Sequence, residues 1–179
     1  STAAVWDEQA DKDVMFRVQL RQARPWFAEA VKALQQLEFD ALGGEVVNPS
    51  VASDEGLKAV IKTIMPFYWS DPAKIAPHEE DFEATSMSAT AFRGDKDSHR
   101  FPFDLRDRLK RLTAPALIVV GDDDFICSPF AAQRLHLCLP NSKLLLIENA
   151  GHFPWLEQSD VFFSDVPVFL KALNSVERP

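Results

Sequence analysis

The sequence contains few of the residues that define disulfide-rich, metal-binding or membrane proteins. Of its 179 residues only two are cysteines, Cys127 and Cys138, which is too few for a disulfide framework or a cysteine-based metal site. The longest apolar runs, such as 116–120 and 144–147, fall well short of the roughly 20 residues that a membrane span needs. We therefore expect no membrane span and a reducing compartment such as the cytoplasm.

Positive charge is also scarce. Lys and Arg number 19 against 27 Asp and Glu, which gives a net charge of −8. Binding to nucleic-acid phosphates needs clustered Lys and Arg, so we expect no nucleic-acid partner. Residues 1–99 hold 17 of the acidic and 10 of the basic residues, and this acidic excess favours a substrate that carries a free amine.

The hydrophobic pattern divides the chain into two parts, which we expect at 1–98 and 99–179. The first part has apolar residues at helical spacing between Val14 and Phe39. Ser53 is a typical N-cap residue before a second helix, and a further helix is expected over Glu79–Phe92. The first part is therefore predicted to be a mostly α-helical domain.

The second part alternates between strand and helix. Two short apolar runs, Ala116–Val120 and Ser142–Glu148, are typical of strands buried on both faces. Helices are predicted over Ser128–Leu139 and Ser159–Leu173. This order with short links implies an α/β fold with parallel strands and right-handed crossovers.

Both predicted strands lead into loops that carry chemistry. The first is followed by Asp122, Asp123 and Asp124, and the second leads to His152. The carboxyl ends of neighbouring parallel strands lie at the same edge of a sheet, where active sites of open α/β sheets are found. A carboxylate there can accept a hydrogen bond from the imidazole, which is the Asp–His half of a nucleophilic triad.

These two loops resemble the end of an α/β-hydrolase, in which the acid precedes the histidine in sequence. The motifs are Gly121-x-x-Asp124 after one strand and Ala150-Gly151-His152 after the next. The helical first part resembles the cap of that superfamily, most of all that of its proline iminopeptidase-like branch. The resemblance to this cap rests on two segments, Pro25-Trp26-Phe27-Ala28-Glu29-Ala30 and Pro66-Phe67-Tyr68-Trp69. The resemblance implies a cap at 1–98 and, at 99–179, the last two parallel strands of the fold with their flanking helices.

By this resemblance Asp124 is the triad acid and His152 the general base. Asp122 and Asp123 remain alternatives for the acid, because one sequence does not exclude a slip along three adjacent Asp residues. Tyr68 and Trp69 are expected either to line a substrate pocket or to pack the cap onto the core. The resemblance implies no cofactor. A metal site formed by the loop acids and His152 has no tight His/Cys spacing to support it, and we expect none.

The nucleophile of the fold is missing from this sequence. It normally lies on a Gly-x-Ser-x-Gly elbow, and no such motif, or Asp or Cys variant of it, occurs here. We expect an N-terminal half of the same hydrolase, as a separate chain in a heterodimer-like assembly, to supply the serine and the oxyanion hole; alternatively that region belongs to the same polypeptide. Ser1 as an N-terminal nucleophile and Cys127 as a thiol nucleophile have little support, since Cys127 has the apolar flanks of an inert core cysteine.

The resemblance implies a serine hydrolase that acts on a small molecule or a short peptide. A proline iminopeptidase-like aminopeptidase is the first expectation. Esterase, lactonase, carbon–carbon hydrolase and epoxide hydrolase are alternatives, because these enzymes share the same Asp/His ending. A non-catalytic binding or scaffold module with a hydrolase-like tail is the alternative from another class.

Overall fold

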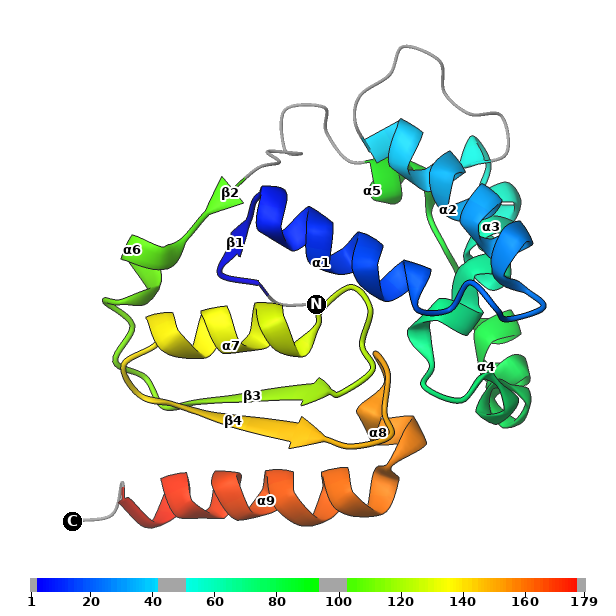
Figure 1. The fold of residues 1–179 in the computed structure, drawn as a ribbon. Coiled ribbons are helices and arrows are strands. Elements are labelled where there is room, and N and C mark those ends of the chain that lie inside the picture. Colours follow the sequence, from blue (N-terminus) through cyan, green and yellow to red (C-terminus); the bar gives the residue numbers. More distant parts are fainter. Residues whose placement is uncertain (1–2, 42–50, 94–102, 177–179) are drawn as a thin grey trace. The chain divides into compact units, whose positions relative to one another are not determined.

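The computed structural model describes residues 3–41, 51–93 and 103–176, and these form two compact units. One unit comprises Ser1–Arg17, Tyr68–Asp71 and Pro102–Pro179, and the other comprises Val18–Phe67 and Pro72–Phe101. The elements, in chain order (Figure 1), are β1 (Val5–Trp6), α1 (Glu8–Gln19), α2 (Phe27–Ala41), α3 (Asp54–Ile64), 3₁₀ turns at Met65–Tyr68 and Pro72–His78, α4 (Glu79–Ala84), α5 (Ala89–Arg93), β2 (Phe103–Asp104), α6 (Arg106–Leu109), β3 (Ala116–Gly121), α7 (Pro129–Cys138), β4 (Ser142–Ile147), α8 (Pro154–Glu157) and α9 (Ser159–Val176).

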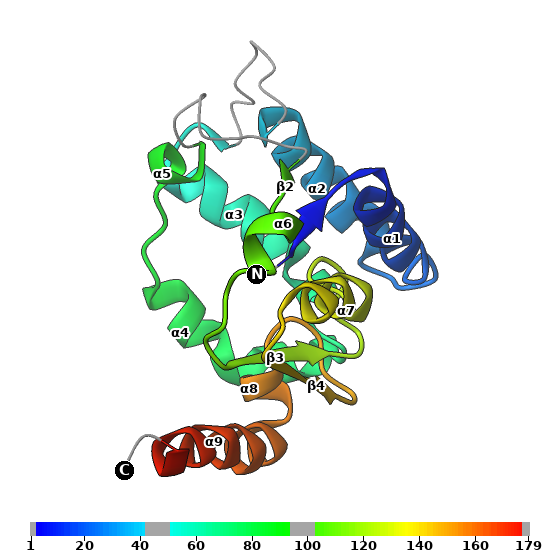
Figure 2. The same cartoon turned by 90° about the vertical axis from the view of Figure 1, so that its left-hand side faces the viewer.

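The first unit is built on the parallel pair β3 and β4, in the register Ala116↔Ser142 to Gly121↔Ile147. Helix α7 connects the two strands and covers one face of the pair, while α9 lies on the other face (Figures 1 and 2). A small core fills the space between β3 and α7, and its buried members are Ala4, Ile118, Val120, Ala132, Leu135 and Cys138. The parallel β-α-β unit expected from the sequence is thus present, with boundaries within a residue or two.

The N-terminal segment belongs to this first unit. Strand β1 pairs with β2 in antiparallel fashion, with Val5 opposite Asp104. Asp7 forms an ion pair with Arg134 of α7 at 2.6 Å, and the hydroxyl of Ser128, the N-cap of α7, donates to the Asp13 carboxylate of α1. The structure therefore divides the chain differently from the expected boundary between 98 and 99. These contacts join residues more than 95 positions apart, which periodicity does not reveal.

The second unit is helical. Helices α2 and α3 pack against each other, and Trp26 makes an edge contact with the ring of Phe67, whose side chain is fully buried (centroids 5.0 Å apart). Ser53 is the N-cap of α3, as predicted, and its hydroxyl accepts the N–H of Gly56 at 3.0 Å. Lys62 of α3 forms an ion pair with Glu83 of α4 at 2.5 Å.

The single helix expected over Glu79–Phe92 is wrong, because the structure has α4 and α5 with an extended link between them. Thr85 ends α4 with φ −71° and ψ 124°. The Ser88 hydroxyl then accepts a backbone N–H in the first turn of α5, and the Asp54 carboxylate accepts another. Side-chain acceptors of this kind compete with the helical hydrogen bonds, so a local apolar pattern does not predict the break.

The boundary expected between residues 98 and 99 lies outside the described residues, as does Ser1. Within the described ranges no helix is both long and apolar enough to cross a membrane.

Candidate active site

The acid and histidine loops lie side by side at the carboxyl ends of β3 and β4. Past the last paired residues of the two strands, the N–H of Asp122 donates to the carbonyl of Ile147 at 3.0 Å. The N–H of Asp123 then donates to the carbonyl of Ala150, also at 3.0 Å. The two loops are therefore joined by backbone hydrogen bonds beyond the sheet.

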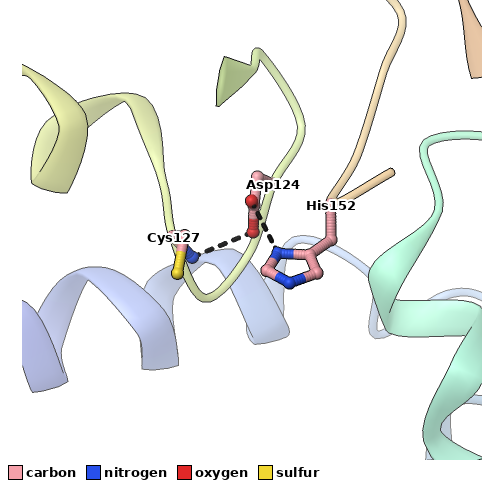
Figure 3. Close-up of side chains that lie close together, drawn as sticks. All are labelled: Asp124, Cys127 and His152. Carbon is pink, nitrogen blue, oxygen red and sulfur yellow. Dashed lines mark hydrogen bonds and ion pairs between the residues drawn. The ribbon is translucent and has the colours of Figure 1, made fainter. Parts of the chain in front are cut away.

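Asp124 and His152 are hydrogen-bonded to each other. The imidazole Nδ1 lies 2.9 Å from Oδ2 of Asp124 (Figure 3), and the two side chains are 18% and 6% exposed, respectively. The other carboxylate oxygen accepts the N–H groups of Ile126 at 3.0 Å and Cys127 at 2.9 Å. Two backbone donors thus hold Oδ1, and Oδ2 is the oxygen that faces Nδ1, which donates to it in the Nδ1–H tautomer.

In that tautomer Nε2 of His152 is the ring nitrogen that can accept a proton. Among the described residues, Nε2 has no hydrogen-bond partner. A neutral imidazole held by a carboxylate at Nδ1 is the geometry that a general base needs.

The three adjacent acids have different positions. Asp124 is buried and contacts His152, whereas Asp122 directs Oδ1 to the N–H of Ala150 at 3.2 Å and so braces the histidine loop. Asp123 joins the same loop through its backbone. The geometry favours Asp124 over its two neighbours as the partner of the imidazole.

Glu157 holds the histidine loop in place, and sequence reasoning did not single it out as a functional residue. This carboxylate, 6% exposed, accepts the N–H of Gly151 at 2.6 Å through one oxygen. Its other oxygen accepts the N–H groups of Ser70 at 2.9 Å and Asp71 at 3.4 Å. In the sequence Glu157 was one of the residues flanking the histidine loop that match the α/β-hydrolase resemblance, five positions after the histidine and in the short helix α8.

The segment 68–71 packs directly against the histidine loop. The N–H of His152 donates to the carbonyl of Tyr68 at 2.7 Å. Gly151 has no room for a side chain, because a Cβ there would meet the carbonyl oxygen of Tyr68 and lie 2.9 Å from the backbone nitrogen of Ser70. This close approach explains the glycine before the histidine.

Tyr68 and Trp69 have different surroundings. The ring of Tyr68 makes edge contacts with Phe125 (centroids 5.0 Å apart) and with His152 (5.3 Å). Burial, and next the negative charge of Asp124, raise the pKa of the Tyr68 hydroxyl to about 12, so it is neutral at physiological pH. Trp69 is 3% exposed and packs on Phe153. A packing role therefore fits Trp69, whereas Tyr68 borders the imidazole.

Cys127 lies in the same loop as Asp124. One possible ligand atom from each of Asp124, Cys127 and His152 lies within 4.8 Å of the other two. Among the described residues this is the group of side chains that has the composition and spacing of a metal site.

Comparison with known proteins finds similarity to hydrolases. No protein-family model matches the chain. A proline iminopeptidase of Pestalotiopsis fici is 39% identical over 59 residues, which are 33% of this chain and 21% of that protein. A proline iminopeptidase of Lacticaseibacillus rhamnosus is 23% identical over 177 residues, which are 93% of this chain and 60% of that protein.

Solved structures of hydrolases resemble this chain in fold at low sequence identity. An esterase from Exiguobacterium antarcticum matches with a TM-score of 0.56 and 18% identity, over 79% of this chain and 48% of that one. An enol-lactonase from Burkholderia xenovorans matches with a TM-score of 0.55 and 18% identity, over 82% of this chain and 50% of that one. The chain thus spans about half the length of these two structures.

Proposed function

Because the chain has the fold of the α/β-hydrolases and is related in sequence to the proline iminopeptidases, we propose that it carries the acid and the base of a serine hydrolase. The fold class expected from the sequence is confirmed by these matches. The observation that carries the proposal is the hydrogen bond between Asp124 and His152 at the ends of two neighbouring parallel strands. The substrate proposed is a small amide or ester.

The mechanism proposed is acyl transfer to water. Nε2 of His152 takes the proton of a serine hydroxyl as its oxygen attacks the substrate carbonyl. The imidazolium then gives this proton to the leaving group, and water, activated by the same nitrogen, hydrolyses the acyl-enzyme. Asp124 holds the imidazole in the tautomer required and stabilises its positive charge, while Glu157 and Tyr68 fix the backbone of the histidine loop.

The serine and the oxyanion hole are proposed to come from an N-terminal region of the hydrolase, as a separate chain or as part of the same polypeptide. Two observations support this: the elbow motif is absent from the sequence, and the described part of the first unit leaves apolar surface uncovered. That surface includes Leu146 of β4 and, on α9, Val161, Phe163, Val168 and Leu170, all exposed. Apolar surface of this kind on a folded unit usually marks an interface.

Intact-mass analysis of the natural preparation tests the origin of the nucleophile. A second polypeptide with a Gly-x-Ser-x-Gly motif, or a longer polypeptide that includes both regions, supports the proposal. A folded, monomeric and active protein consisting of these 179 residues alone would overturn it.

Within the hydrolases, an aminopeptidase that releases an N-terminal residue is our first proposal for the substrate class. It is supported by the sequence relationship with proline iminopeptidases and by the acidic excess of residues 1–99. Hydrolysis of a proline arylamide should then exceed that of a short aryl ester in specificity constant. An assembled protein that cleaves the ester and ignores every aminoacyl amide would favour an esterase or lactonase instead.

Substitution of His152 by alanine separates catalysis from a non-catalytic role. If Nε2 is the general base, His152→Ala should lower kcat of the assembled protein by several orders of magnitude. His78→Gln, in the other unit, is the matched histidine control and should leave kcat within about twofold of the parent. A binding or scaffold module would show the same activity, or none, in all three proteins.

A further inference from the structure

The thiol of Cys127 lies beside the Asp124–His152 pair and has no part in the mechanism above. The turn after β3 brings it there: the N–H of Cys127 donates to Oδ1 of Asp124 at 2.9 Å, and the cysteine lies three residues beyond the acid. Figure 3 shows Asp124 and His152 pointing toward each other from two loops, with Cys127 beside Asp124. Cys127 is half-buried.

These side chains offer one sulfur, one nitrogen and one carboxylate oxygen, a ligand set that suits zinc better than magnesium or calcium. In a tetrahedral zinc site, bonds of roughly 2.0–2.3 Å place neighbouring ligand atoms about 3.5 Å apart. The ligand atoms here lie within 4.8 Å of one another, so the most distant of them must approach by up to about 1.3 Å when a zinc ion binds. A fourth position would remain for water, as in zinc sites with three protein ligands.

Charge also favours a divalent cation. A thiolate and a carboxylate together neutralise a charge of +2, and the adjacent acids Asp122 and Asp123 add negative potential at this loop. Arg17 donates to the carbonyl of Asp122 and is itself paired with Asp13.

We propose that Asp124, Cys127 and His152 form a binding site for a thiophilic divalent cation of the zinc type, and that its occupancy switches off the general base. A cation bound to either ring nitrogen of His152 would block the general base. A cation on Nδ1 replaces the hydrogen bond to Asp124, and a cation on Nε2 occupies the atom that accepts the serine proton. Binding deprotonates the thiol, and the proton goes to solvent. The inhibitory consequence rests on the proposed hydrolase function, whereas the site itself does not.

The test uses the assembled protein, Zn²⁺ as the probe and a chromophoric chelator as competitor. The parent should bind Zn²⁺ with one saturable site, and Cys127→Ala should bind at least ~10-fold more weakly, since even outer-shell losses cost that much. Cys138→Ala removes the other thiol, which is buried in the core of the same unit, and should bind Zn²⁺ like the parent. Co²⁺ provides a second readout: a thiolate-to-metal absorption band should form with the parent and be absent with Cys127→Ala.

Hydrolase activity measured with and without Zn²⁺ distinguishes the proposed metal site from the proposed hydrolase function. Zn²⁺ should inhibit the parent reversibly. At a Zn²⁺ concentration that lowers the activity of the parent at least ~10-fold, Cys127→Ala should keep the activity that it has without Zn²⁺. Binding that depends on Cys127 in a protein without hydrolase activity would support the site and reject the hydrolase. Normal activity without Cys127-dependent binding, or equal Zn²⁺ affinity in the parent and Cys127→Ala, would overturn the site and leave the hydrolase intact.

Discussion

Replacement of Glu157 by glutamine tests whether one buried carboxylate positions the histidine loop. Its two oxygens together accept three backbone N–H groups, from Gly151, Ser70 and Asp71. Glutamine has the same shape but only one oxygen, and its other terminal atom is a donor. Glu157→Gln therefore turns the NH₂ group toward either the Gly151 N–H or the pair of N–H groups in 68–71.

The cost follows from the lost bond and from its burial. A hydrogen bond to a charged acceptor contributes about 1.5–3 kcal/mol, and a buried donor left without an acceptor costs about 1–3 kcal/mol. Because Glu157 is 6% exposed, water compensates for little of this loss. Relaxation of the loop recovers part of it, so we expect the free energy of unfolding to fall by about 2–4 kcal/mol.

Urea unfolding followed by tryptophan fluorescence measures this change, and hydrogen exchange at the Gly151 and Ser70 amides locates it. Glu148→Gln is the matched control, because Glu148 is exposed at the end of β4, and it should change stability by less than about 0.5 kcal/mol. If Glu157→Gln costs less than about 1 kcal/mol and both amides keep their protection, the carboxylate does not hold the loop and our reasoning is refuted.

Three further predictions concern residues around the same loops. Gly151→Ala should destabilise the first unit by about 1–3 kcal/mol and lower activity, since its Cβ would collide with the backbone of Tyr68; an unchanged Tm would contradict the close packing. Tyr68 is the sole tyrosine, so the tyrosinate absorbance should titrate near pH 12 in the folded protein and near ~10 in urea. Because the folded-state pKa is the higher one, the contribution of the neutral Tyr68 hydroxyl to the free energy of unfolding is complete below pH ~10 and is lost as the pH rises toward 12. A folded-state midpoint near 10 would show that the ring is solvated. Ser128→Ala should cost about 1 kcal/mol in thermal or urea unfolding, because α7 loses its N-cap and the hydrogen bond to Asp13, and a change within error would deny that role.

Local patterns were sufficient to predict the elements that position the site. The apolar runs of β3 and β4 and the Ser128–Pro129 start of α7 follow from short-range preferences, so their positions were predicted within a residue or two. The break between α4 and α5 was not predicted, because the acceptor that helps start α5 is Asp54, which lies 35 positions away.

Prediction of the candidate site from the sequence was limited in the same way. The sequence alone placed an acidic loop and a histidine loop at one sheet edge, because parallel strands bring their carboxyl ends together. It did not choose among three adjacent Asp residues, since that choice depends on the direction each side chain takes; in the structure the turn over Ile126 and Cys127 directs Asp124 at the imidazole.

The sequence by itself thus determined the type and order of the elements and the two loops that carry chemistry. Only the tertiary structure decided which carboxylate meets His152, that Glu157 joins 68–71 to the histidine loop, and that the thiol of Cys127 lies beside both. The physical reason is the separation in sequence over which each kind of interaction acts. Periodicity and capping act within a few residues along the chain, whereas hydrogen bonds between residues tens of positions apart depend on how the folded backbone brings them together.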